Sequence, residues 1–138
     1  MKKIIHFLII LITALTVSCS PANDSTDVRI HDIWVLESIN GVTYSRAEGQ
    51  SLHPTIEIYL EEARFSGNTG CNSMSGKVKV ERSTILFSDI ITTKMFCSDV
   101  DEVSFLSALK EADSYKIEKM RLYLFNDEKE IFVFRKID

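Results

Sequence analysis

Apolar and polar residues alternate over short stretches from about residue 30 to the end of the chain. Alternation with a period of two is typical of β-strands that bury one face. The positions that share a face in this way are Trp34/Leu36, Ile56/Ile58/Leu60, Val78/Val80, Tyr115/Ile117, Leu122/Leu124 and Ile131/Val133. Asn40-Gly41 and the run 126–129 are turn signals between neighbouring stretches. Because the gaps are too short for crossover helices, the pattern predicts antiparallel strands.

One segment, residues 99–112, leaves this pattern and has the periodicity of a helix. Its apolar stripe consists of Phe105, Leu109 and Ala112. Ser98 or Asp99 is expected to cap the helix, with Asp101 or Glu102 completing a capping box three residues later. The sequence therefore predicts one amphipathic helix with an acidic outer side.

The last strand is apolar on both faces, because Phe132 and Phe134 alternate with Ile131 and Val133. Such a strand is expected to be central in its sheet or covered by the helix. The predicted fold is α+β and mainly β. It has about eight antiparallel strands in a curved sheet or barrel, and one helix at about 99–112 packs against them.

The N-terminus has the pattern of a secretory signal peptide. Lys2 and Lys3 precede an apolar stretch, residues 4–17, and small residues follow it before Cys19. The stretch is shorter than the roughly 20 residues that span a bilayer, so a permanent transmembrane helix is the weaker interpretation. Ser18-Cys19 resembles a bacterial lipobox, although the leucine usual three residues before the cysteine is displaced to Leu15. Ordinary cleavage that leaves a free thiol is the alternative.

We therefore expect three regions. Residues 1–18 are a lipoprotein signal peptide, 19–29 are the lipidated Cys19 and a flexible polar tether, and 30–138 are one domain. The expected location is the cell envelope, where the acyl anchor would hold the protein on a membrane. The outer membrane is the preferred one, with the protein on its periplasmic or surface face. The membrane, through this anchor, is the first expected partner.

The charge balance argues against a nucleic acid as a partner. The chain has 16 basic and 20 acidic side chains, and loss of Lys2 and Lys3 with the leader makes it more acidic. Lys and Arg do not cluster in sequence, whereas proteins that bind nucleic acid have a basic patch or stripe.

The strongest motifs are Gly67-Asn68-Thr69-Gly70-Cys71-Asn72, with Gly76 after it, and Thr93-Lys94-Met95-Phe96-Cys97. Further elements in the same order are Trp34-Val35-Leu36, Asn40-Gly41, Pro54-Thr55-Ile56, Phe105-Leu106-Ser107-Ala108-Leu109, Tyr115-Lys116-Ile117, Leu122-Tyr123-Leu124 and Phe134-Arg135. In these elements the chain resembles the META domain family of HslJ-like bacterial lipoproteins. The resemblance implies an envelope protein associated with stress tolerance, without an established catalytic activity.

Cys71 and Cys97 lie in the two motifs that carry this resemblance. They are the only cysteines left once Cys19 is acylated, and an envelope compartment is oxidising. A disulfide between them is the leading interpretation, and two buried thiols are the alternative. The bond requires their Cα atoms to lie within about 7 Å.

The glycines of the central motif, Gly67, Gly70 and Gly76, have two interpretations. A phosphate cradle is disfavoured because their spacing matches neither the P-loop nor the dinucleotide fingerprint. We expect instead that they permit positive φ or close backbone approach, and that Asn72 bonds local backbone.

No metal, cofactor or catalytic residue is expected. His31 and His53 are isolated in the sequence and are expected to be solvated. Asp99, Asp101 and Glu102 are a weak candidate cation site, but acidic residues are common in the first turn of a helix because the helix dipole favours them. We therefore expect that the protein is not an enzyme.

Three classes of function remain. The first is a lipid-anchored, non-enzymatic envelope protein that supports stress tolerance or binds another envelope protein. The second is a small β-scaffold that inhibits a hydrolase. The third, which ranks lowest, is an enzyme or a small-ligand carrier that uses the interior of the barrel. A protruding loop with exposed aromatics would favour the inhibitor, a deep polar cavity the carrier, and a featureless acidic surface the first class.

Overall fold

A computed structural model gives the fold and describes residues 25–46 and 52–137. The predicted signal peptide, Cys19 and most of the tether lie outside the described residues. In chain order the elements are the 3-10 helix η1 (Val28–Ile30), β1 (Ile33–Ile39), β2 (Val42–Thr43), β3 (Thr55–Tyr59), β4 (Arg64–Asn68), β5 (Ser73–Glu81), β6 (Thr84–Thr92), α2 (Glu102–Glu111), β7 (Ser114–Glu118), β8 (Arg121–Asn126) and β9 (Lys129–Lys136).

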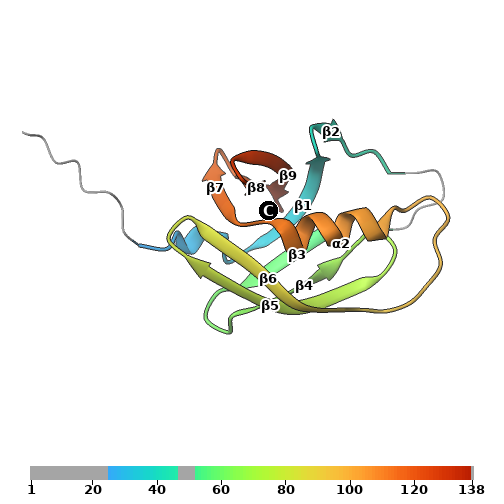
Figure 1. The fold of residues 1–138 in the computed structure, drawn as a ribbon, viewed down its shortest axis with the longest axis horizontal. Helices are drawn as coiled ribbons and strands as arrows, with labels where there is room; N and C mark the ends of the chain where they lie inside the picture. The colour runs from blue at the N-terminus through green and yellow to red at the C-terminus, as the bar shows by residue number, and fades with distance from the viewer. Residues whose placement is uncertain (1–24, 47–51, 138) are drawn as a thin grey trace, which may run out of the picture.

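All strands belong to one antiparallel sheet (Figure 1). Its order is β2-β1-β3-β4-β5-β6-β7-β8-β9, and β1 also pairs with β9, so the sheet curves round into a barrel. The predicted fold class is confirmed. The described residues form nine strands and not about eight, because the Asn40-Gly41 turn folds the two-residue strand β2 back onto β1.

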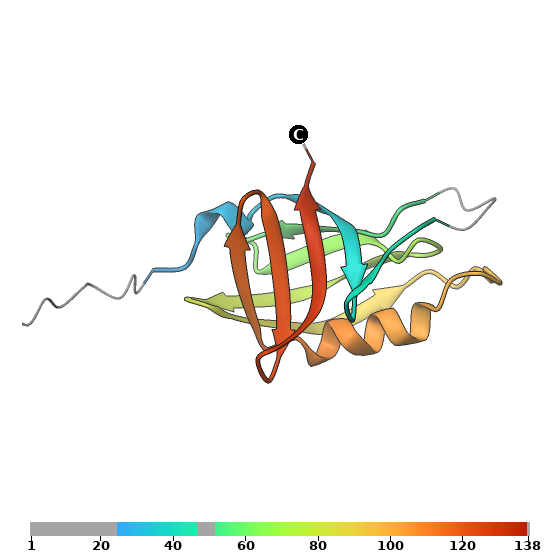
Figure 2. The same cartoon turned by 90° about the horizontal axis from the view of Figure 1, so that it is seen from above.

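The barrel wall is weakest between β6 and β7, which share a single residue pair, Thr84↔Ser114. Beyond this pair α2 packs along β6 and covers the barrel there (Figure 2). The helix turns Phe105, Ala108 and Leu109 inward, and all three side chains are buried. Phe105 and Leu109 of the predicted stripe are therefore confirmed, together with the helix's role in covering the sheet. The third residue, Ala112, is buried but follows the helix as its C-cap.

The start of α2 differs from the prediction. The helix begins at Glu102 and not at 99, and Asp101 is its N-cap, with a side chain that accepts a hydrogen bond from the backbone N–H of Ser104 at 3.1 Å. A cap satisfies a backbone donor of the first turn, so the helix starts directly after Asp101. Ser98 and Asp99 are left in the preceding loop, where the two side chains bond each other.

Large side chains fill the barrel interior. Trp34, Phe65, Phe132 and Phe134 are all at most 1% exposed, and Phe65 meets Phe87 edge to face with ring centroids 5.1 Å apart. The last strand is central, as predicted, because β9 pairs with β8 on one side and with β1 on the other. A barrel of about eight strands is just wide enough for such a core, so the described part of the interior is packed with side chains.

Candidate functional site

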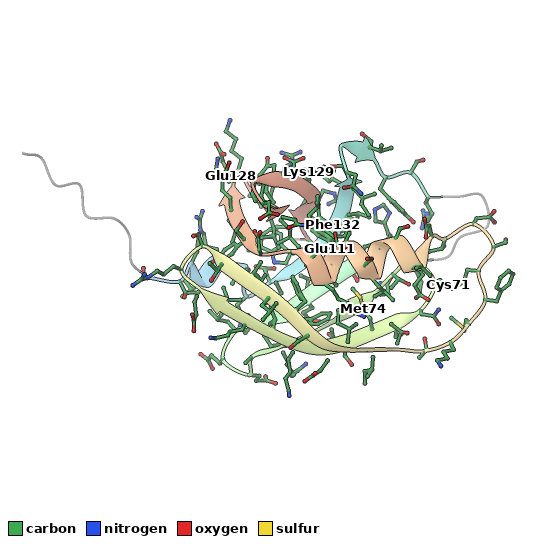
Figure 3. The ribbon with its side chains drawn as sticks, viewed as in Figure 1. Cys71, Met74, Glu111, Glu128, Lys129 and Phe132 are labelled. Carbon is green, nitrogen blue, oxygen red and sulfur yellow. A yellow bond between two sulfur atoms is a disulfide. The ribbon has the colours of Figure 1, made fainter. Side chains whose placement is uncertain are left out.

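A disulfide joins two loops at one end of the barrel. It links Cys71, in the segment between β4 and β5, to Cys97, in the loop of residues 93–101 that connects β6 to α2. The Cα atoms are 5.9 Å apart, within the range that disulfides require. Figure 3 shows Cys71 at the end of the barrel where α2 begins. We call residues 93–101 the β6–α2 loop.

The buried amide of Asn72 holds the same loop by hydrogen bonds. Its Oδ1 accepts from the backbone N–H of Met95 at 2.7 Å and from the hydroxyl of Thr93 at 2.8 Å. Its Nδ2 donates to the carbonyl of Met95 at 3.1 Å. The expectation that Asn72 bonds local backbone is wrong, because its backbone partner lies 23 residues further along the chain. One side chain thus pairs with both backbone groups of Met95.

Glu102 connects this network to the helix. Its carboxylate accepts hydrogen bonds from the hydroxyl of Thr69 at 2.7 Å and from Nδ2 of Asn72 at 3.1 Å. Thr69 and Asn72 are each 1% exposed. Buried polar groups are costly unless they are paired, so this cluster fixes the first turn of α2 against the glycine-rich segment. The sequence identified Asn72 and Glu102 as residues of interest but missed their connection and the role of Thr69.

The motif glycines stand where a larger residue would clash with the backbone or would be strained. A Cβ on Gly67 would lie 2.0 Å from the carbonyl oxygen of Thr55, and a Cβ on Gly76 would lie 2.7 Å from that of Ser88. Gly70 has φ +93°, in the region that favours glycine. These positions agree with close approach and positive φ, the roles that the turn interpretation assigns to them.

Phe96 stands between the two fixed points of the β6–α2 loop. The amide of Asn72 holds the backbone of Met95 on one side, and the disulfide holds Cys97 on the other. Phe96 itself is 95% exposed, and Met95 is 61% exposed. The first turn of α2 adds the exposed Val103 at this end of the molecule. The loop therefore displays large apolar side chains on a backbone that is held in place.

This loop lies far from the point where the chain enters the domain. In Figures 1 and 2, η1 is near one end of the long axis and the β6–α2 loop is at the other end. The β6–α2 loop and η1 therefore lie at opposite ends of the molecule.

The two histidines considered as ligands have other partners. A ring nitrogen of His53, Nε2, is 2.7 Å from the carbonyl oxygen of Leu36, and its ring packs edge to face on Tyr44. Nδ1 of His31 accepts a hydrogen bond from the backbone N–H of Leu60 at 3.3 Å. His53 is half-buried, so the expectation of a solvated side chain is wrong there.

The described residues contain neither a metal-binding cluster nor a membrane-spanning helix. Across 25–46 and 52–137, no group of three or more His, Cys, Asp or Glu side chains is arranged to hold a metal ion. In the same part of the chain, no helix combines the length and apolar character that crossing a bilayer requires.

The fold and the cross-linked loops define a small antiparallel barrel domain with one helix in its wall and a disulfide at one end. A family model described as the META domain matches residues 27–138, and the chain belongs to this family. The resemblance seen in the sequence motifs is therefore confirmed.

Solved structures with the same fold are distant in sequence. A protein solved by NMR is 24% identical, with a TM-score of 0.61 over 77% of this chain and 89% of its own. An NMR structure from Burkholderia xenovorans is 19% identical, with a TM-score of 0.62 over 84% of this chain and 92% of its own. The crystal structure of a DUF4847 family protein from Bacteroides vulgatus is 15% identical, with a TM-score of 0.56 over 80% of this chain and 97% of its own. No match was found among curated proteins.

Proposed function

We propose that this protein is a non-enzymatic envelope protein, anchored through an acylated Cys19, whose domain binds another envelope protein with the β6–α2 loop. The observation that carries the proposal is Phe96, which is 95% exposed although both neighbouring residues are fixed. Exposing a large aromatic side chain to water is unfavourable, and exposed apolar patches commonly mark interaction sites.

The fixed backbone strengthens this argument. A loop that is already ordered loses little conformational entropy when it binds, so more of the contact energy remains as affinity. Aromatic side chains are also prominent among the residues that dominate the energy of protein interfaces. The disulfide and the Asn72 amide therefore have a role in binding as well as in stability.

An anchor at Cys19 would leave the β6–α2 loop accessible to a partner. Acylation of Cys19 would leave only the segment before η1 as a tether, and this segment enters the domain at the end opposite to the β6–α2 loop (Figures 1 and 2). The loop would then face away from the membrane that holds the anchor. The outer membrane is the membrane that we propose, and tolerance of envelope stress is the process that we expect the binding to support.

Site-specific photocrosslinking in living cells tests the proposal. A photoreactive phenylalanine analogue replaces Phe96 in one strain, and replaces Leu86, a 52% exposed residue of β6, in a control strain. We expect a discrete cross-linked product at position 96 that is absent at position 86. The same products at both positions, or none at position 96, would contradict the proposal.

The hydrolase inhibitor is the second candidate. The exposed Phe96 is the aromatic side chain expected of an inhibitor, but we rank this candidate second because nothing among the described residues specifies a hydrolase as the partner. An aromatic side chain on a disulfide-linked loop suits insertion into a cleft of a hydrolase. If the cross-linked partner is a hydrolase, its activity should fall on addition of this protein and should recover when the Phe96→Ala variant is added instead. Full hydrolase activity in the presence of the unsubstituted protein would exclude inhibition.

A further inference from the structure

A cavity of about 400 Å³ opens beside the β6–α2 loop, between the β1–β2 hairpin and the first turn of α2. Leu36, Pro54 and Phe105 line it, and each of the three is buried. The exposed Val42 of the hairpin and the half-buried Val100 of the loop also belong to its lining. The cavity is thus largely apolar and lies at the same end of the barrel as Phe96.

The polar side of the cavity is acidic. Asp99 and Asp101 line it, and no Lys, Arg or His is among the described residues that do so. Hydrogen bonds from Ser104 to the Asp101 carboxylate lower the pKa of Asp101, which favours its ionised form. Neither aspartate forms an ion pair with a described residue.

The N-terminus of α2 does not cancel this charge. A helix N-terminus is equivalent to about half a positive charge. Asp99, Asp101 and Glu102 together carry three formal negative charges around it, and Glu102 accepts hydrogen bonds from the neutral groups of Thr69 and Asn72. Among the residues that line the cavity, the charge is therefore negative, and Arg46 and Lys94 are not among them.

We propose that this cavity receives a basic side chain, Lys or Arg, of the partner protein that contacts Phe96. The alkyl stem of such a side chain would lie against Leu36 and Phe105, and its charged head would reach the carboxylates of Asp99 and Asp101. Long basic side chains divide in this way between an apolar body and a polar tip. The inference rests on the proposed function and names the partner's chemistry.

Neither the expected tether nor residues 47–51 supply a suitable occupant from this chain. Arg46, which follows the cavity-lining Ser45, is exposed and is not among the residues that line the cavity. The expected tether, residues 19–29, has one basic residue, Arg29, and its guanidinium is paired with Asp27. Residues 47–51, which follow the hairpin in the sequence, contain no Lys or Arg. A second copy is disfavoured because acidic residues exceed basic ones in this chain, so two copies repel each other. Charge complementarity therefore points to a different protein with an exposed basic residue.

Two short peptides test the proposal. The first is acetyl-Phe-Arg-amide, and the second is its neutral counterpart with citrulline in place of arginine. Each is titrated into the full chain in nanodiscs of neutral lipid, with isotope-labelled Ile, Leu and Val methyl groups observed by NMR. Ile39, Val42 and Val100 line the cavity and report on its occupancy, whereas Val28 in η1 reports on non-specific binding.

We expect the arginine peptide to shift the three cavity methyl groups and to leave Val28 unchanged. The arginine would form ion pairs with Asp99 and Asp101. Two exposed ion pairs of ordinary strength should make the arginine peptide bind about threefold to tenfold more tightly than the citrulline peptide. Equal affinity of the two peptides, or shifts that include Val28 as strongly as the cavity, would overturn the proposal. This comparison uses the unsubstituted chain, so it does not depend on the folding of a variant.

Charge-neutral variants supply the control. Asp99→Asn with Asp101→Asn removes both charges, and asparagine caps a helix as well as aspartate does. The preference for arginine should fall to within about twofold in this variant, since the ion pairs are lost. Glu128→Gln removes one charge from an exposed turn far from Cys71 in Figure 3 and should keep the preference. A preference that survives the double substitution would overturn the assignment of the carboxylates.

The outcome is separable from that of the proposed function. If the arginine preference is absent but the cross-link at position 96 forms, only the cavity assignment fails. If both are absent, the binding role of this end of the barrel fails as well.

Discussion

Removal of the Cys71–Cys97 disulfide should lower the stability of the domain by an amount that the loop length predicts. The bond closes a loop with a sequence separation of 26 residues. In the chain-entropy model a loop of this length restricts the unfolded chain by about 3.5 kcal/mol at 25 °C. The substitutions Cys71→Ala and Cys97→Ala together remove the bond without leaving a buried thiol, and Cys71 is only 4% exposed.

Equilibrium unfolding in urea measures this loss directly. We expect the double variant to lose about 3.5 kcal/mol, which corresponds to a fall in the melting temperature of roughly 14 °C for a domain of this size. The unsubstituted protein treated with a reductant should behave in the same way, and the reductant should not change the variant. This comparison separates the effect of the bond from that of the alanine side chains.

The β6–α2 loop should stay in place when the disulfide alone is removed, because Asn72 still holds both backbone groups of Met95. Hydrogen exchange at the Met95 amide is therefore expected to remain slow in the native state of the double alanine variant. A loss below about 1 kcal/mol, with an unchanged denaturant slope, would refute the loop-closure argument. Fast exchange at Met95 would refute the role of Asn72.

Three further substitutions test the fold and the anchor. Leu109→Asp should destabilise the domain by more than about 4 kcal/mol, because it places an unpaired charge at a fully buried position; an unchanged melting temperature would contradict the packing of α2. Gly67→Ala should cost about 1–3 kcal/mol in urea unfolding, because the added Cβ meets the backbone oxygen of Thr55, whereas Gly41→Ala, with nothing within 4 Å, should cost only the strain of its positive φ. Cys19→Ser should release the protein from the membrane fraction or leave the precursor uncleaved, and normal processing with continued membrane fractionation would place the anchor elsewhere.

The sequence predicted the elements whose pattern is local. Alternation identified the long strands, and the spacing of Phe105 and Leu109 gave the buried side of the helix. The exact start of α2 was missed because Ser98, Asp99 and Asp101 are all good N-cap residues, and the choice among them depends on where the loop is held. Closure of the barrel by β1 and β9 is a pairing between distant strands, which no local pattern contains.

Of the candidate site, only the Cys71–Cys97 disulfide was predicted from the sequence. Cys71 and Cys97 were paired on the basis of compartment and family resemblance. The contacts of Asn72 with Met95 and of Thr69 with Glu102 join segments 23 to 33 residues apart, so their partners cannot be read from neighbouring sequence. Phe96 lies next to a motif cysteine, and its exposure depends on the direction in which the fixed loop points. From the sequence alone, a phenylalanine next to a motif cysteine is equally compatible with a buried position in the core.

The affinity of the protein cross-linked at position 96 for two alanine variants tests the central claim most directly. The claim is that the β6–α2 loop binds a partner through Phe96. If it is right, Phe96→Ala should weaken binding about 30-fold or more, as expected for an aromatic residue that dominates an interface, and Leu86→Ala should change the dissociation constant less than about twofold. Equal dissociation constants for the unsubstituted protein and the Phe96→Ala variant would contradict the account.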